Sequence, residues 1–204
     1  MAKVYFYEFS GYNGNFESLC SLLPSENKEK AANIKDELKK KQFVFSRFLL
    51  RYALSKNGYT DDEITFGKNG KPYFKGGYPF FSISHSDSAV CVSLSENELG
   101  IDVQIRKELS ENLTERYFSS DEREYIKKGL TTACDIWSIK ESIIKYDGSS
   151  IAYLKNANVL FSGQKIYVKD RPQLKISNFS DDKYTVYLCS EDNKNNFYNI
   201  KNMP

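Results

Sequence analysis

Apolar residues alternate with polar ones near the start of the chain, over residues 4–9, and this spacing of two predicts a strand. Pro24-Ser25-Glu26 then opens a stretch with apolar residues at helical spacing, for which we predict one long helix over residues 28–55. Asn57-Gly58 is typical of a helix end in the left-handed conformation. Gly, Asn and Asp residues separate the short strand patterns that follow, at residues 64–66, 73–74, 81–84, 89–94 and 99–105.

The second half of the chain repeats this order. We predict two polar helices over residues 109–117 and 120–128, and a stronger helix over residues 132–146 that Asp147-Gly148 closes. Strand patterns complete the chain at residues 159–161, 165–168, 173–179 and 184–189. Each half is thus a major helix followed by a small antiparallel sheet. This order predicts an α+β fold of two similar subdomains, residues 1–98 and residues 99–204.

Composition and charge then narrow the class of protein. The 204 residues include fifteen Tyr and fourteen Phe, and 40% are hydrophobic, which favours a packed globular chain over a disordered one. No apolar run approaches the roughly 20 residues of a membrane span, and the first residues lack a secretory-signal pattern, so we expect no membrane. The net charge of +2 gives no argument for a nucleic-acid partner.

The cysteines are scattered along the chain, at positions 20, 91, 134 and 189, without a Cys-x-x-Cys pair. This spacing supports neither a zinc site nor a disulfide framework, and we expect a reducing, cytoplasmic location. The single histidine, His85, excludes any mechanism that needs two histidines.

Residues 99–105 have the most informative pattern. Apolar residues occupy the odd positions, whereas Gly100, Asp102 and Gln104 occupy the even ones. In a strand the two sets face opposite sides, so Asp102 and Gln104 project together, roughly 7 Å apart at the backbone, where two oxygen donors can share a hard cation. Gly100 has no side chain, and we expect it to leave room for a ligand. Taken alone, the pattern is more typical of an edge strand with a solvated polar face.

The helix predicted over residues 132–146 favours a cation site over a solvated edge strand. Trp137, Glu141 and Lys145 lie four residues apart and therefore share one line of the helix, beside a stripe of isoleucines. An exposed Glu–Lys pair on a helix contributes only about 0.3–0.5 kcal/mol to stability, and it would not explain the lone Trp beside it.

His85 follows the strand predicted over residues 81–84 and lies between Ser84 and Ser86. A lone histidine is more often structural, but a strand end rich in Ser and His offers several hydrogen-bond donors to a phosphate. The lysines at positions 28, 30, 35 and 39–41 are, taken alone, typical of a solvated helix face. Asn69-Gly70-Lys71-Pro72 is typical of a turn.

Taken in chain order, these segments resemble the 4′-phosphopantetheinyl transferase superfamily, and within it the long type that serves surfactin synthetase and similar carrier-protein systems. The stretches that carry the resemblance are residues 70–72 (GKP), 81–86 (FSISHS), 100–104 (GIDVQ), 118–122 (FSSDE) and 137–145 (WSIKESIIK). A chain of this length resembles two fused copies of the short, trimeric holo-carrier synthases. The resemblance therefore implies two similar α+β subdomains related by a pseudo-twofold axis, in a monomer.

The resemblance also implies a reaction. The 4′-phosphopantetheine group of coenzyme A passes to a serine of an apo acyl, peptidyl or aryl carrier protein, and adenosine 3′,5′-bisphosphate is released. Mg²⁺, or Mn²⁺ in its place, is the implied cofactor. The residue types agree with this, because Mg²⁺ prefers oxygen ligands from one or two carboxylates together with substrate phosphates.

Roles for individual residues follow from the same resemblance. The implied metal ligands are Asp102, Gln104 and Glu141. The implied catalytic residues are Glu141, or in second place Glu122, as proton acceptor, and Lys145 as the residue that stabilises the leaving phosphate. The implied contacts to coenzyme A come from Lys71, Ser84, His85, Lys28, Lys30 and Lys140.

Two positions depart from the family's pattern. Gln104 stands where the family usually has an acid, so we expect weaker metal binding than in relatives with an acid there. Gln42 stands where the family often has an arginine, and that contact to coenzyme A is not expected here.

Three other interpretations stay open. The client could belong to fatty-acid synthesis rather than to polyketide or non-ribosomal peptide assembly. The chain could instead be a catalytically impaired coenzyme A or nucleotide-binding protein of the same fold, although Asp102, Glu141 and Lys145 argue against this. Without the resemblance, a metal-dependent phosphohydrolase would compete, but such enzymes usually have more carboxylates or histidines.

Overall fold

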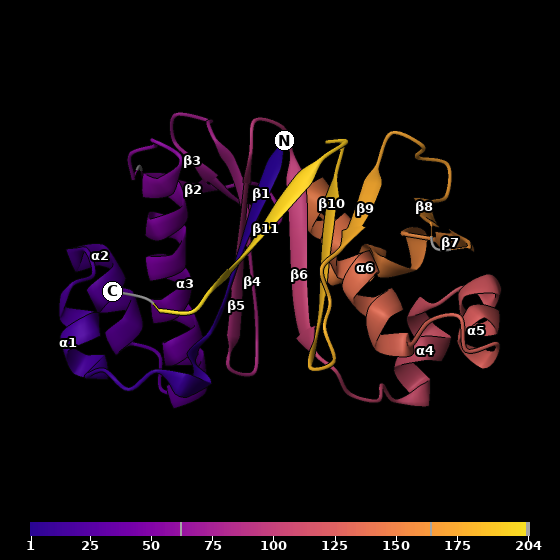
Figure 1. The fold of residues 1–204 in the computed structure, drawn as a ribbon, viewed down its shortest axis with the longest axis horizontal. Coiled ribbons are helices and arrows are strands. Elements are labelled where there is room, and N and C mark those ends of the chain that lie inside the picture. Colours follow the sequence, from indigo (N-terminus) through magenta and orange to yellow (C-terminus); the bar gives the residue numbers. More distant parts are fainter. Residues whose placement is uncertain (62, 164, 203–204) are drawn as a thin grey trace.

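A computed structural model describes residues 1–61, 63–163 and 165–202 and arranges them as four layers, in the order helix, sheet, sheet, helix (Figure 1). The elements of the first half are β1 (Ala2–Glu8), η1 (Phe9–Gly11), α1 (Phe16–Ser21), α2 (Ser25–Ala32), α3 (Glu37–Lys56), β2 (Ile64–Phe66), β3 (Pro72–Phe74), β4 (Phe80–Ser86) and β5 (Ala89–Ser95). Those of the second half are β6 (Leu99–Ile105), α4 (Glu111–Tyr117), α5 (Ser120–Lys127), α6 (Ala133–Asp147), η2 (Ile151–Asn156), β7 (Val159–Ser162), β8 (Lys165–Val168), β9 (Lys175–Asn178), β10 (Tyr184–Ser190) and β11 (Asn195–Ile200). The predicted α+β class is confirmed.

The two larger sheets have the strand orders β11-β1-β5-β4 and β6-β10-β9. Their neighbours are antiparallel, as predicted, except that β1 and β11 run parallel, with Ala2 opposite Asn195. The parallel pair involves β11, a strand that the sequence pattern did not predict. Because β11 joins the sheet of the first half, the chain crosses the boundary predicted between residues 98 and 99, and that boundary stays a prediction (Figure 1).

Buried hydrophobic clusters fill the spaces between the four layers. One lies between α3 and the first sheet, one lies between the two sheets, and one lies between α6 and the second sheet. Representative buried pairs are, in that order, Phe45 and Val92, Val4 and Ile101, and Ile139 and Tyr187. The odd positions of residues 99–105 thus face the space between the sheets, and the even positions face α6.

The single helix expected over residues 28–55 is in fact two helices, α2 and α3. The Asp36 side chain accepts a hydrogen bond from the Lys39 backbone N at 2.8 Å, and this cap starts α3. The apolar spacing continues across the break, which is why the pattern alone predicted one helix. Gly58 and Gly148 adopt positive φ angles of 74° and 60°, as expected of helix ends.

Three serines of β4 join the two sheets. The Oγ atoms of Ser82, Ser84 and Ser86 accept hydrogen bonds at 3.0–3.2 Å from every second backbone N–H of β6, those of Ile101, Val103 and Ile105. Because β6 is the edge strand of its sheet, the hydroxyls satisfy backbone donors that would otherwise lack partners. This seam places β4 of the first half directly beside the strand that carries Asp102.

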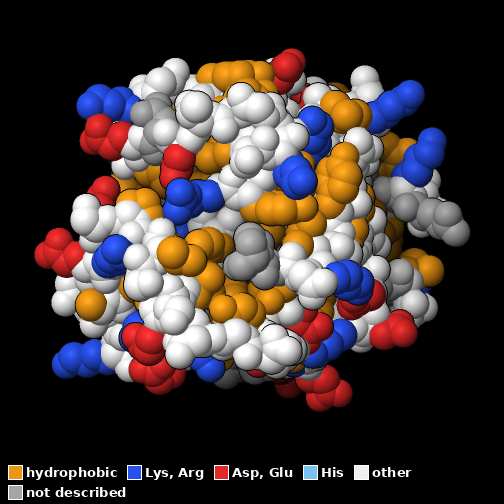
Figure 2. Space-filling model, turned by 60° about the vertical axis from the view of Figure 1, so that its left-hand side comes forward, with side chains coloured by type: hydrophobic (Ala, Val, Ile, Leu, Met, Phe, Trp, Pro, Cys, Tyr) orange, Lys and Arg blue, Asp and Glu red, His pale blue; other side chains and the backbone are white. Residues whose placement is uncertain are grey.

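Figure 2 shows the side of the molecule toward which α1, α2 and α3 lie. Lys and Arg side chains alternate there with Asp and Glu, and hydrophobic side chains appear between them, in keeping with the near-neutral net charge of +2. None of the helices in the described ranges is both long enough and apolar enough to cross a membrane. All four cysteines are free.

Candidate active site

Asp102 lies in the middle of β6 with only 1% of its surface exposed. Its Oδ1 accepts hydrogen bonds from Ser84 Oγ at 2.9 Å and from Lys145 Nζ at 2.7 Å. Its Oδ2 accepts from Ser138 Oγ at 2.9 Å and from Gln104 Nε2 at 3.3 Å. Four donors from β4, β6 and α6 thus compensate the burial of this carboxylate, and they converge from both halves of the chain.

The backbone of α6 approaches β6 most closely at Gly100. A Cβ atom at this position would lie 2.1 Å from the Ser142 backbone oxygen and 2.3 Å from the Tyr146 nitrogen, so only glycine fits. The expectation that Gly100 leaves room for a ligand was therefore wrong, because the helix itself occupies that space. The close contact brings one side of α6 onto Asp102.

Glu141 lies on that side of α6 and is mostly buried. Burial raises the pKa of Glu141 to about 7, the negative charge of Asp102 adds to the increase, and Lys145 opposes it. The two carboxylates are therefore close enough to repel each other. A divalent cation held by both would remove this repulsion.

Lys145 is the accessible cation of the site. Its side chain is 28% exposed, and its Nζ donates to Ser84 Oγ at 2.8 Å as well as to Asp102. An ammonium group with access to solvent can exchange its carboxylate partner for the phosphate of a substrate.

Of the three predicted metal ligands, Gln104 is the least suitably oriented. Its amide N–H points to Asp102, whereas its Oε1 accepts a hydrogen bond from Ser86 Oγ at 3.3 Å, so the amide must rotate before its oxygen can share an ion with Asp102. Across residues 1–61, 63–163 and 165–202, no three His, Cys, Asp or Glu side chains cluster as metal ligands. A Mg²⁺ ion here would rely on Asp102, Glu141, water and substrate phosphates, which is a usual environment for this ion.

A pocket of about 240 Å³ opens beside this cluster. The turn at residues 69–72 lines one side, Ser82 and Ile83 of β4 line another, and Lys145 and Gly148 close it from the end of α6. Asn69 Nδ2 donates to the Gly148 backbone oxygen at 2.8 Å, so the turn of the first half contacts the helix of the second.

Lys71 lines this pocket, but its ammonium group already has three partners within the protein. It pairs with Glu98 and donates to the backbone oxygens of Tyr146 at 2.7 Å and Leu99 at 3.3 Å. Lys71 therefore holds the end of α6 in this structure, and a phosphate would have to replace Glu98 to reach it.

His85 is exposed, one residue beyond Ser84 and on the opposite side of β4. Although the residue is exposed, partial desolvation by the surrounding protein lowers the pKa of His85, the positive charge of Lys145 lowers it further, and Asp102 opposes the change. The neutral ring is thus favoured in the absence of a bound anion.

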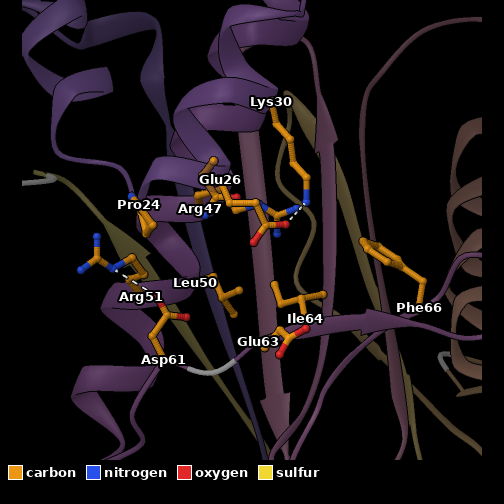
Figure 3. Close-up of a pocket in the computed structure, with 11 residues that line it drawn as sticks. Pro24, Glu26, Lys30, Arg47, Leu50, Arg51, Asp61, Glu63, Ile64 and Phe66 are labelled. Atoms are coloured by element: carbon orange, nitrogen blue, oxygen red, sulfur yellow. Dashed lines mark hydrogen bonds and ion pairs between the residues drawn. The ribbon is translucent and has the colours of Figure 1, made fainter.

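Lys28 and Lys30 are exposed on α2, and the structure does not bring them to Asp102. Lys30 lines a separate pocket of about 310 Å³ between α2, α3 and β2, where it pairs with Glu26 (Figure 3). Arg51 and Asp61 form a second ion pair in that pocket, with Nε and Oδ2 3.4 Å apart (Figure 3).

Glu122 and Lys140 pair with each other, with 3.0 Å between Oε1 and Nζ, and both side chains are 0% exposed. Burial lowers the pKa of Lys140, and the ion pair with Glu122 opposes this change. Their hydrogen bonds run to α5, η2 and β7 rather than to Ser84, Lys145 or Asp102.

Sequence reasoning missed Ser138, which donates to Asp102. The signal was present, because Ser138 lies three residues before Glu141 and seven before Lys145, a spacing that shares one helix face. Trp137, which the pattern had singled out, packs instead against Tyr117 with ring centroids 5.8 Å apart. Glu141 and Lys145 of the predicted line thus lie at Asp102, and Ser138 rather than Trp137 accompanies them.

An acid pair, an accessible lysine and a hydroxyl between two α+β halves form a site suited to a phosphate-bearing substrate. Residues 98–201 match the model of the 4′-phosphopantetheinyl transferase superfamily. Similar proteins include the 4′-phosphopantetheinyl transferases gsp of Aneurinibacillus migulanus (25% identical over 78% of this chain and 69% of the relative), AcpT of Salmonella typhi (31%, 55% and 62%) and Sfp of Bacillus subtilis strain 168 (27%, 67% and 65%).

The chain therefore belongs to the 4′-phosphopantetheinyl transferase superfamily, as the resemblance of its motifs implied. It is accordingly an enzyme of the transferase class. The matched region spans between 62% and 69% of the length of these three relatives.

Proposed function

We propose that this enzyme transfers the 4′-phosphopantetheine group of coenzyme A to the hydroxyl of a serine in an apo carrier protein. The observation that carries the proposal is the convergence of Asp102, Glu141 and Lys145 from β6 and α6, next to Ser84 of β4. Two acids and one accessible lysine are the groups that a magnesium-dependent transfer from a pyrophosphate needs.

Coenzyme A would bind with its phosphates at Lys145, Ser84 and His85. Lys145 already donates to Ser84 and Asp102 and has access to solvent, so a phosphate can take its ammonium without unfolding the site. Lys71 would join only after Glu98 releases it. A negative phosphate near His85 would favour the charged imidazole and reverse the lowered pKa of that group.

Asp102 and Glu141, with the amide oxygen of Gln104 after rotation, would hold Mg²⁺ or Mn²⁺. When bound, the ion supplies neutralisation of the charge on the pyrophosphate and orientation of its oxygens. Burial and the repulsion from Asp102 raise the pKa of Glu141, and a cation bound between the two acids would remove the repulsion.

The bond changes assign a role to each side chain. The serine oxygen forms a bond to the phosphorus on the pantetheine side, and the bond from that phosphorus to the oxygen of adenosine 3′,5′-bisphosphate breaks. Glu141 accepts the serine proton, because it is a carboxylate beside Asp102 that is not fully buried. Lys145 stabilises the negative charge on the leaving bisphosphate.

A monomer in the cytoplasm is the form in which we expect this reaction. Ser84 comes from the first half and Asp102, Glu141 and Lys145 from the second, so one chain supplies both sides of the site. The carrier protein belongs to fatty-acid, polyketide or non-ribosomal peptide synthesis. An acidic recognition helix on it would complement the slight positive charge of the enzyme.

The test is incubation of a panel of apo carrier proteins from these three pathways with coenzyme A, Mg²⁺ and the enzyme. Mass spectrometry of each carrier protein should show the mass of phosphopantetheine added to at least one of them, and chelation of Mg²⁺ should prevent the addition. Binding of coenzyme A without addition to any carrier would support the impaired binding protein instead and would overturn the proposal.

A further inference from the structure

Glu122 and Lys140 form an ion pair that solvent does not reach, which we call the sealed pair. Both side chains are 0% exposed. The cost of removing two charges from water is large, and such a pair persists only when every donor and acceptor has a partner. The contacts of each residue therefore indicate what the pair does.

The ammonium group of Lys140 has an acceptor for each of its three protons. Besides Glu122, it donates to the backbone oxygens of Leu154 at 3.1 Å and Ala157 at 2.8 Å, at η2 and just beyond it. The lysine thus connects α6 to the segment that covers it.

Both oxygens of Glu122 are engaged as well. Oε1 accepts from the Val159 backbone N at 2.8 Å as well as from Lys140, and Oε2 accepts from the Ser119 backbone N at 2.8 Å. The second contact completes a capping box that starts α5. The sealed pair thus ties α5, α6, η2 and β7 together.

The position of α6 is therefore set from two sides. On the side of β6, the helix backbone lies against Gly100, and Ser138 and Lys145 contact Asp102. On the far side, Lys140 is held by the sealed pair. Glu141, the next residue after Lys140, is the acid that must face Asp102, so a shift of the helix at Lys140 would move it.

We propose that Glu122 and Lys140 are positioning residues, which fix α6 so that Glu141 faces Asp102, and that neither residue touches the substrate. The proposal rests on the function proposed above. It excludes Glu122 as the proton acceptor, because a carrier serine cannot reach a fully buried carboxylate whose oxygens are occupied by two backbone N–H groups and an ammonium group.

Three variants test this proposal: Glu122→Gln, Lys140→Met and the double variant Glu122→Gln/Lys140→Met. Glutamine keeps the size of the side chain and one oxygen for the N–H of Val159, but its NH2 group would face the N–H of Ser119, so we expect a modest loss of stability in both variants that carry it. Lys128→Met is the matched control, because Lys128 forms an exposed pair with Glu124 of α5, with 3.4 Å between Nζ and Oε1. It should leave every measured quantity within the error of the wild type.

The first readout is kcat for transfer to a carrier protein that the wild type modifies. Lys140→Met leaves the buried Glu122 without its charged partner and should lower kcat roughly tenfold or more, whereas the double variant should recover about threefold or more of that loss. If Glu122 accepts the proton, adding Glu122→Gln to Lys140→Met can only lower kcat further. A further decrease would overturn the proposal.

The second readout is Mn²⁺ affinity, measured by electron paramagnetic resonance without substrate and well below the unfolding temperature. We expect Glu122→Gln and Lys140→Met each to weaken Mn²⁺ binding several-fold, and the double variant to restore part of it. If Lys140→Met does not fold, the Mn²⁺ affinity and kcat of Glu122→Gln test the proposal. A lower kcat with unchanged Mn²⁺ affinity would assign Glu122 to the chemistry and overturn the proposal. Failure of the wild type to modify any carrier would instead overturn the proposed function and leave the Mn²⁺ result interpretable.

Discussion

Two acid–lysine pairs lie on different sides of α6, and they differ in access rather than in geometry. The distance from Nζ to the nearest carboxylate oxygen is 2.7 Å for Lys145 and Asp102 and 3.0 Å for Lys140 and Glu122. The lysine side chain is 28% exposed in the first pair and 0% exposed in the second. The first lysine can exchange its partner for a phosphate, and the second cannot.

This difference shows that residue type alone does not assign a role in such a site. Both pairs belong to stretches that resemble one family, and the motifs alone left the proton transfer open between Glu141, beside the accessible pair, and Glu122 of the sealed pair. The acids of both pairs are buried and hydrogen-bonded, and what separates the pairs is the exposure of the lysine, which is 28% for Lys145 and 0% for Lys140. We therefore assign the chemistry to the accessible pair together with Glu141, and the positioning of α6 to the sealed pair.

The largest expected effect is on the accessible pair. Asp102→Asn should lower kcat about 10³-fold or more, because it removes the charge around which Ser84, Ser138 and Lys145 converge. The fold should remain, since the side chain of Lys145 can turn to solvent. The rate is measured by mass spectrometry of the carrier, with circular dichroism as the control. Wild-type activity in this variant would remove Asp102 from the site.

For the free energy of unfolding, we expect the sealed pair to matter more than the accessible pair. Lys140→Met should lower the free energy of unfolding by about 3–5 kcal/mol, because it leaves Glu122 buried without its partner. Lys145→Met should lower it by at most about 1 kcal/mol, as expected of a partly exposed pair. Urea unfolding of both variants measures the two values. Equal losses would show that access does not distinguish the pairs.

The pH dependence of stability should reflect Glu141. Its pKa is about 7 in the folded protein against an ordinary value of 4.5, so the folded state binds the proton more tightly. The stabilisation from this group is complete below pH 4.5 and is lost as the pH rises through 7. Thermal unfolding in a chelator should show this decrease in the wild type and not in Glu141→Gln. The same decrease in both would place its origin elsewhere.

The smallest expected effect concerns the metal requirement. Gln104→Glu should reduce the Mg²⁺ concentration at half-maximal rate several-fold, because it adds a charged oxygen where an amide now faces Asp102 with its N–H. The measurement is a Mg²⁺ titration of the initial rate at saturating coenzyme A. An unchanged requirement would exclude residue 104 from the metal shell.

The sequence predicted the parts of this molecule that depend on local spacing. The period of two in residues 99–105 placed Asp102 and Gln104 on one face, and the period of four in α6 brought Glu141 and Lys145 to the same side. The structure has both features. These periods depend only on backbone geometry, which local residue types largely determine.

These local patterns could not predict contacts between residues that are far apart in the sequence. The parallel pairing of β1 with β11 joins residues at opposite ends of the chain, and no local signal indicates it. The enclosure of Lys140 by Leu154, Ala157 and Glu122 depends on where η2 and α5 fold back onto α6. Pattern reasoning could identify Lys140 as a charged residue in a motif, but could not show that it is buried.

The most direct test of this division of roles is one experiment on three proteins. Transfer of phosphopantetheine to the same carrier protein is followed by mass spectrometry for the wild type, Asp102→Asn and Glu122→Gln/Lys140→Met. We predict modification by the wild type and at a reduced rate by the double variant, and no detectable modification by Asp102→Asn. An active Asp102→Asn together with a fully inactive but folded double variant would contradict the account, because the chemistry would then lie at the sealed pair.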